Sequence, residues 1–129
     1  MEGGTRHPRP HVPQRITVYV FGTTLAMIGV LGWAAVHSAR PTTTQAALTG
    51  VLTLMIGVAH LHPLQLAPRT KVSADTAPAF AAAVLLPTPL AMLASLGGIG
   101  TGEIIRRTAP VQVAYNTTVA GLRAGAAAA

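Results

Sequence analysis

Charged residues are absent from three long stretches of the chain, residues 16–39, 41–68 and 76–102. An α-helix needs about 20 apolar residues to cross the hydrocarbon core of a bilayer, which is about 30 Å thick. Each stretch reaches that length, and none has the polar residues that a helix in water presents at every turn or two. The pattern predicts an all-α fold, an integral membrane helical bundle of about four to five helices.

Prolines and polar residues divide the chain into shorter elements. A basic tail with three prolines, residues 1–15, precedes the first apolar run, and we predict that it is disordered. Residues 16–129 then form the helical membrane domain. Within it we predict helices over residues 16–37, 44–62, 75–86, 90–107 and 110–126. Thr44 is the expected N-cap of the second helix.

Pro87-Thr88-Pro89 lies in the middle of the third uncharged stretch. Two prolines so close together remove two backbone donors and disfavour helix just before each ring. A helical hairpin accommodates them, with a first arm over residues 75–86 whose rise of about 18 Å is short of a full span. Such an arm is either re-entrant or packed within the bundle, where irregular backbone is shielded from lipid. A single span followed by a tail is the alternative for residues 75–107.

Small residues recur along one face of two predicted helices. The strip in the first helix consists of Gly22, Ala26 and Gly29, and the strip in the fourth of Ala91, Ser95, Gly98 and Gly102. Strips of this kind let two helix backbones approach closely and gain van der Waals contact. We expect both strips to be helix-packing surfaces.

The composition excludes an ordinary soluble domain. Hydrophobic residues make up 50% of the chain and charged residues 9%, whereas soluble domains average about 25% charged residues. The net charge is +6, but the basic residues lie in short clusters between the apolar stretches. This placement indicates contact with anionic lipid headgroups and argues against nucleic acid as a partner.

The basic residues also predict the orientation. With the hairpin, seven of the nine fall on one side, namely Arg6, Arg9, Arg15, Arg69, Lys71, Arg106 and Arg107. Cytoplasmic loops carry the excess of Lys and Arg. We therefore predict a multi-pass protein of the cell membrane with a cytoplasmic N-terminus. Residues 1–15, 65–74 and 106–109 are then cytoplasmic, and residues 38–44 and 87–89 face outward.

Residues 1–36 also invite comparison with a secretory signal peptide, because a basic start precedes an apolar run. Residues 36–38, Val-His-Ser, would be the cleavage site. The apolar run, however, has about 21 residues, and the core of a signal peptide has about 7–15. We favour a membrane helix that is retained.

Three polar residues in the apolar region are candidates for function: Glu103, Asn116 and Asp75. Acidic residues at membrane depth are functional by default. For Glu103 the alternative is a local ion pair with Arg106 or Arg107, because side chains three and four positions apart meet on a helix. We favour this structural role, and we expect Asp75 to cap the helix that follows it. Asn116-Thr117-Thr118 matches the sequence pattern for N-glycosylation. We expect Asn116 to hydrogen-bond to a neighbouring helix instead.

The remaining motifs are weak. His60 and His62 would reach one metal ion only if the backbone were extended, so we interpret them as interfacial histidines without a ligand role. The glycines of Gly98-x-Gly100-x-Gly102 do not have the spacing of a dinucleotide-binding loop. Cysteine is absent, and no nucleophile, carboxylate pair or phosphate loop is present. We predict no enzyme, no metal and no cofactor.

The segment KVSADTAPAFAAAVLLPTPLAMLASLGGIGTGEIIRR, followed by VAYNT, resembles a known family. It is similar to the membrane-associated sensor (MASE-type) modules that precede HD-domain phosphohydrolases or diguanylate cyclases in bacterial signalling proteins. The positions that match are Asp75, Leu85, Leu86, Pro87, Gly98, Gly102, Arg106, Arg107, Tyr115 and Asn116. Val119 departs from the family pattern, which has Gln there, and no output domain follows in this sequence.

The resemblance implies a membrane-embedded sensory or anchoring module of a bacterial signalling system, without a catalytic domain of its own. Two other functions are compatible with the sequence. One is a small-solute carrier, similar to the substrate-binding membrane subunits of vitamin uptake systems, and the other is a structural membrane subunit. As partners we expect the lipid bilayer, and either further copies of the chain or a separate signalling protein.

Overall fold

The computed structural model describes residues 13–62, 64–67, 70–72 and 74–129. Most of the predicted basic tail, residues 1–12, lies outside the described residues. The elements in chain order are α1 (Gln14–His37), α2 (Thr43–Leu61), β1 (Leu64–Ala67), β2 (Thr70–Val72), α3 (Thr76–Leu85), α4 (Thr88–Ile105) and α5 (Pro110–Ala128). The prediction of an all-α helical bundle is confirmed, with five helices and one short strand pair in the described part of the chain.

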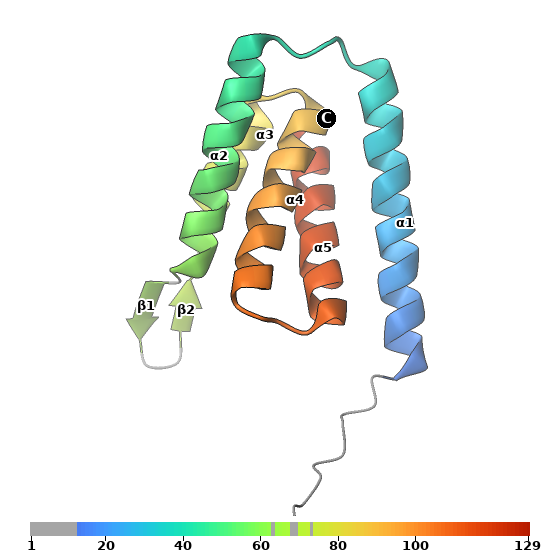
Figure 1. Cartoon of the computed structure of the whole chain (residues 1–129), viewed down its shortest axis with the longest axis vertical. Coiled ribbons are helices and arrows are strands. Elements are labelled where there is room, and N and C mark those ends of the chain that lie inside the picture. Colours follow the sequence, from blue (N-terminus) through green and yellow to red (C-terminus); the bar gives the residue numbers. More distant parts are fainter. Residues whose placement is uncertain (1–12, 63, 68–69, 73) are drawn as a thin grey trace, which may run out of the picture.

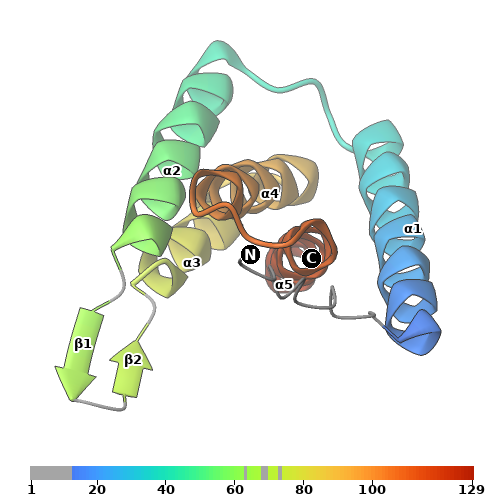
Figure 2. The ribbon, with the colours of Figure 1, turned by 60° about the horizontal axis from the view of Figure 1, so that its bottom comes forward.

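Helix α4 lies at the centre of the bundle. It contacts α2, α3 and α5 and, at the edge, α1, whereas α1 packs mainly on α5 (Figure 1). Figure 2 shows α3, α4 and α5 enclosed between α2 on one side and α1 on the other. The core comprises Leu52, Ile56, Ala82, Leu86, Ala91 and Ala94. It therefore joins α2, the end of α3 and α4.

The helices alternate in direction, so the connections gather at two ends (Figure 1). One end holds the start of α1, the strand pair and the connection 106–109. We call it the hairpin end, after the β-hairpin that β1 and β2 form. The connections 38–42 and 86–87 and the end of α5 lie at the opposite end. Helices α3 and α4 are therefore antiparallel neighbours, and residues 75–107 do not form a single helix.

Pro87 and Pro89 explain the break between α3 and α4. Leu86 is extended, with φ −112° and ψ 148°, and α4 begins at Thr88 with Pro89 in its first turn. The first N–H groups of a helix have no partner within it, so a proline there removes no hydrogen bond. The prolines thus end one helix and start the next.

Two local predictions need correction. The N-cap of α2 is Thr42 and not Thr44, because Thr42 forms a capping box with Gln45. The Thr42 hydroxyl accepts from the Gln45 backbone N–H at 3.2 Å, and the Thr42 N–H donates to the Gln45 side chain at 2.9 Å. The connection between the second and third helices, for which no strand was predicted, contains the antiparallel pair β1–β2, in which Leu64 pairs with Val72.

The small residues of α4 lie at helix contacts. A Cβ added to Gly98 would lie 2.7 Å from the Ile56 Cβ, and one added to Gly102 would lie 2.9 Å from the imidazole of His60. Ala91 and Ser95 on the same face are buried. Only residues without a larger side chain allow α2 to approach α4 this closely.

The strip of α1 does not make the predicted contact within this chain. Gly22 and Gly29 have no atom within 4 Å of an added Cβ, and Ala26 is exposed. Helix α1 instead turns Val20, Met27 and other residues toward the bundle.

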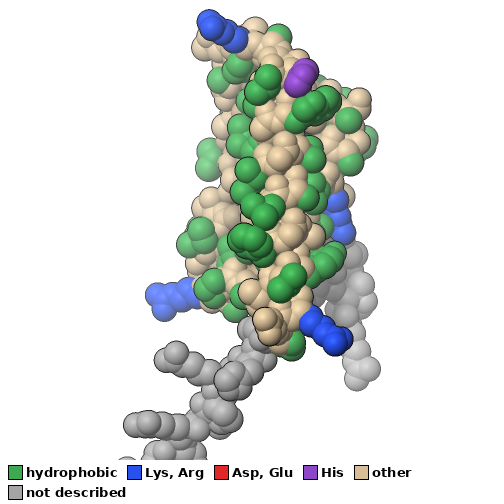
Figure 3. All heavy atoms as spheres, turned by 90° about the vertical axis from the view of Figure 1, so that its right-hand side faces the viewer, with side chains coloured by type: hydrophobic (Ala, Val, Ile, Leu, Met, Phe, Trp, Pro, Cys, Tyr) green, Lys and Arg blue, Asp and Glu red, His purple; other side chains and the backbone are tan. Residues whose placement is uncertain are grey.

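The outside of the bundle is apolar. Helices α1 and α2 are long and apolar enough to cross a membrane. Only 11% of the most apolar 18-residue stretch of each helix is buried against the described part of the chain. Figure 3 shows hydrophobic side chains along the length of the α1 side of the molecule, with basic side chains near both ends and one at the edge. Most of the apolar surface of these two helices is thus left without a partner in the chain.

Candidate functional site

The imidazole of His60 lies between two carboxylates. Its Nδ1 is 2.8 Å from Oδ2 of Asp75, and its Nε2 is 3.1 Å from Oε1 of Glu103. Asn116 donates a hydrogen bond from Nδ2 to the same Glu103 oxygen at 2.7 Å. We refer to His60, Asp75, Glu103 and Asn116 as the His60 cluster.

The four members come from four different elements. His60 lies in the last turn of α2, Asp75 directly precedes α3, Glu103 lies near the end of α4, and Asn116 lies in the second turn of α5. All four positions are at the hairpin end of the bundle, because the helices alternate in direction. Gly102 leaves room for the imidazole against α4.

The cluster is largely shielded from solvent. The side chain of Glu103 is 6% exposed, and those of His60 and Asp75 are 14% and 13% exposed. Hydrogen bonds and ion pairs at such sites are stronger than in water, and an unpartnered group costs correspondingly more. The cluster therefore ties the ends of four elements together.

The geometry of the cluster requires an extra proton. A neutral imidazole has one N–H and one lone pair, yet here both ring nitrogens face a carboxylate oxygen. If both carboxylates are ionised, His60 must be an imidazolium that donates on both sides. If His60 is neutral, one of the two carboxyl groups must hold the proton. In either case the loss of that proton leaves a lone pair of the ring facing a lone pair of an oxygen.

Glu103 does not form the predicted ion pair with Arg106 or Arg107. The ion-pair partner of Glu103 among the described residues is His60, and both arginines are exposed. Helix α4 ends at Ile105, and Arg107 has a left-handed backbone with φ 55°. Arg106 continues the helical hydrogen bonding of α4, with its N–H on the Gly102 carbonyl, but its side chain is exposed whereas Glu103 is buried and points into the bundle.

Asp75 occupies the predicted N-cap position of α3, but its side chain makes no capping hydrogen bond. Its carboxylate bonds to His60 instead. Asn116 reaches across from α5 to α4, and its hydrogen bond goes to Glu103. The three polar residues singled out in the sequence thus belong to one cluster.

His60 was expected to be an interfacial histidine without a metal-ligand role, and its two carboxylate partners were not predicted. His62 is exposed, and its ring lies 3.0 Å from the carbonyl of Val58. The two histidines do not converge on one point. One feature of the sequence could have indicated the role of His60. If the predicted helices alternate in direction, His60, Asp75 and Glu103 all lie at the same end of the bundle.

No protein-family model, curated protein or solved structure matches this chain.

Proposed function

We propose that this chain is a multi-pass membrane protein that serves as the sensory module of a signalling system, and that its input is a change of protonation in the His60 cluster. The observation that carries the proposal is the placement of one imidazole between two shielded carboxylates that belong to different helices. The resemblance of residues 65–120 to membrane-associated sensor modules favours the same class of function.

The surface of α1 and α2 supports a location in the membrane. Large apolar side chains on these helices are exposed along their length, among them Phe21, Trp33 and Leu54 at 66%, 66% and 70%. A soluble protein rarely leaves so large an apolar area in contact with water. In a bilayer these side chains face lipid.

The basic residues support a cytoplasmic hairpin end. Arg15 lies in the first turn of α1, Arg106 and Arg107 follow α4, and Lys71 lies in β2. Arg40 lies in the connection between α1 and α2, at the opposite end. Because cytoplasmic loops carry the excess of Lys and Arg, the His60 cluster lies near the cytoplasmic headgroups.

A proton acts on the bundle through the contacts of His60. With the proton present, the imidazole holds the start of α3 and the end of α4 against α2. When the proton leaves, one of these two contacts becomes repulsive, and the helix ends separate. This movement occurs at the cytoplasmic end, where a separate partner protein or a further copy of the chain would respond to it.

The test is the spacing of helix ends as a function of pH. Cysteine is absent from the chain, so spin labels can be placed at Val58→Cys on α2 and Ile104→Cys on α4, two exposed positions. We expect the distance between the labels to increase as the pH is raised from about 5 to about 9. The same pair of labels in a His60→Gln variant should show no such change, because glutamine does not titrate. A distance that responds equally in both proteins would contradict the proposal.

The orientation has its own test. A membrane-impermeant thiol reagent should label Ser38→Cys in intact cells, and Thr108→Cys only after the membrane is permeabilised. Labelling of position 108 from outside would overturn the proposed orientation. A solute carrier, the alternative function, would move a solute across liposomes without a partner protein.

A further inference from the structure

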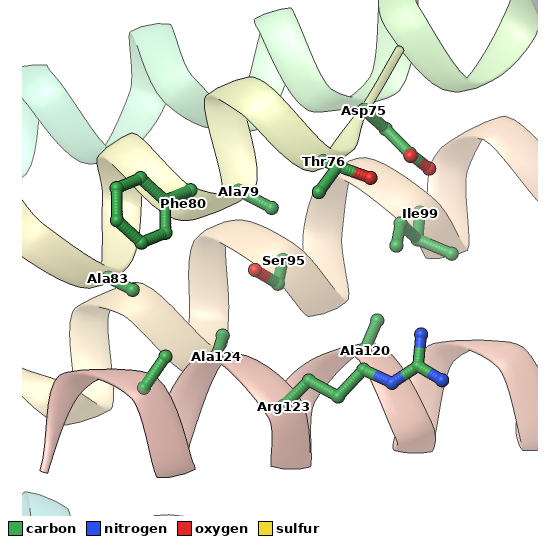
Figure 4. A pocket seen from close by; sticks show the side chains of 11 residues that line it. Asp75, Thr76, Ala79, Phe80, Ala83, Ser95, Ile99, Ala120, Arg123 and Ala124 are labelled. Atoms are coloured by element: carbon green, nitrogen blue, oxygen red, sulfur yellow. The ribbon is translucent and has the colours of Figure 1, made fainter. Parts of the chain in front are cut away.

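A cavity of about 240 Å³ lies between α3, α4 and α5 (Figure 4). Alanine is the commonest residue in its wall, with Ala79 of α3 and Ala124 of α5 among them, and Phe80 of α3 also lines it. Ile99 of α4 adds further apolar surface. Asp75 lies at one end of the cavity in Figure 4. The lining is thus apolar, with a few polar groups at defined positions, as in small-molecule sites.

Ser95 supplies a hydrogen-bonding group to this cavity. Its side chain lies between Ala79 of α3 and Ala124 of α5 in Figure 4, and it is 1% exposed. Its hydroxyl has no hydrogen-bond partner among the described residues. A buried hydroxyl without a partner is unfavourable, and each such group in a folded protein needs an explanation. A polar atom of a bound molecule would satisfy it.

Arg123 supplies a positive charge. In Figure 4 its side chain extends from α5 along the cavity, and the guanidinium group lies beside Ile99 and Ala120. The ion pairs in the described part of the chain are those of His60 with Asp75 and Glu103, and Arg123 takes part in neither. At membrane depth an ionised side chain without a counter-ion is expensive, and such residues mark binding sites. The high cost assumes the membrane location proposed above.

We propose that this cavity binds a small organic acid with one carboxylate, a short aliphatic body and a second oxygen. The carboxylate would lie on the guanidinium of Arg123, which matches its two oxygens in a bidentate pair. The second oxygen, a hydroxyl or a carbonyl, would hydrogen-bond to Ser95. The aliphatic part would fill the space between the alanines.

The size and the charge of the cavity limit the ligand further. Its volume is below the roughly 300–1,000 Å³ of most small-molecule pockets, so the ligand has only a few carbon atoms. Arg123 matches one carboxylate, and the carboxylate of Asp75 at the end of the cavity offers no hydrogen-bond donor to a second one. A monocarboxylate should therefore bind better than a dicarboxylate. An anionic lipid offers the same chemistry, an oxyanion on an aliphatic chain, but its two long chains exceed the cavity.

The test is equilibrium dialysis of the full chain in phosphatidylcholine nanodiscs with radiolabelled 3-hydroxybutyrate, butyrate and succinate. We expect saturable binding of one molecule per chain, strongest for 3-hydroxybutyrate and weakest for succinate. Arg123→Gln should weaken binding about tenfold or more, and Arg123→Lys by less, because lysine keeps the charge but loses the bidentate pair. Ser95→Ala should abolish the preference for 3-hydroxybutyrate over butyrate.

Arg40→Gln is the matched control, since it removes an arginine in the connection between α1 and α2 and should leave binding unchanged. Circular dichroism shows whether each variant folds, and Arg123→Lys provides the result if the glutamine variant does not. Equal binding by the wild-type chain and Arg123→Lys and Arg123→Gln would overturn the proposal. Absence of binding to all three acids would do so too, as would binding that appears only when anionic phospholipid is added to the nanodiscs. His60→Gln leaves Arg123 and Ser95 in place but removes a partner of Asp75, which lines the cavity. The Arg123 and Ser95 variants therefore test the cavity, and the spin-label distances test the proton response.

Discussion

Helices α1 and α4 are both long, apolar and marked by a strip of small residues, yet one lies at the edge of the bundle and the other at its centre. Helix α1 buries Val20, Met27 and Ala34, whereas α4 buries eight residues along its length. The difference lies in the neighbours. The α4 strip meets Ile56 and His60 of α2, whereas Gly22 and Gly29 of the α1 strip meet no atom of the described residues. A small-residue strip therefore permits close packing, but it does not determine which helices pack.

The largest difference between the two strips is expected when the same bulky side chain is added to each of them. Gly98→Leu places atoms against the backbone carbonyl of Thr53 and the side chain of Ile56, and α2 must move. We expect the free energy of unfolding to fall by about 3 kcal/mol, measured by denaturation in detergent. Gly22→Leu is the matched variant on α1, and its expected effect is about 0.5 kcal/mol or less. Similar losses for both variants would show that the α1 strip is also a contact, for example between two copies of the chain.

Glu103 gives the second test, because a partner in another helix and a partner in the same helix lead to different losses of stability when Glu103 is replaced. If Glu103 holds His60 and Asn116, Glu103→Gln should lower the free energy of unfolding by about 1–3 kcal/mol, since buried groups lose charged hydrogen bonds. If it paired only with exposed arginines, the loss would be about 0–1 kcal/mol. Arg106→Gln is the control and should change stability by about 0.5 kcal/mol or less. A larger effect at Arg106 than at Glu103 would favour the local pair.

The smallest expected effect concerns the attachment of α1. The hydroxyls of Thr24 on α1 and Thr118 on α5 lie 3.1 Å apart, and Thr118 is buried. Hydrogen bonds between membrane helices average about 0.6 kcal/mol, so Thr24→Val should cost about that much. Spin labels on α1 and α5 should show greater mobility of α1 in this variant. Thr23→Val is the control, because the Thr23 hydroxyl bonds only within α1. Equal effects of the two variants would exclude a role for the contact with Thr118.

The His60 cluster shows how far a reading of the sequence reaches. Glu103, Asp75 and Asn116 are recognisable as polar residues in an apolar chain, because the removal of a polar group from water costs free energy wherever it lies in a membrane. Their common partner is harder to predict. The positions of Arg106 and Arg107 satisfy the local rule for a helical ion pair, and this rule gives the wrong partner because Glu103 is buried in the bundle against His60 while both arginines are exposed. The direction in which Glu103 points depends on α2, which lies 43 residues earlier at His60.

Local features of the sequence are sufficient to predict the helical fold, the number of helices and the break at Pro87. These depend on the length of the apolar stretches and on the missing backbone N–H and fixed φ of proline. The tertiary structure alone decided which faces meet and which groups become partners. It placed Ser95 and Arg123 in the wall of one cavity and His60 between two carboxylates, and it left Gly22 and Gly29 of α1 without a neighbour among the described residues. Packing of this kind depends on the fit of side chains that are distant in sequence, and no local pattern contains that information.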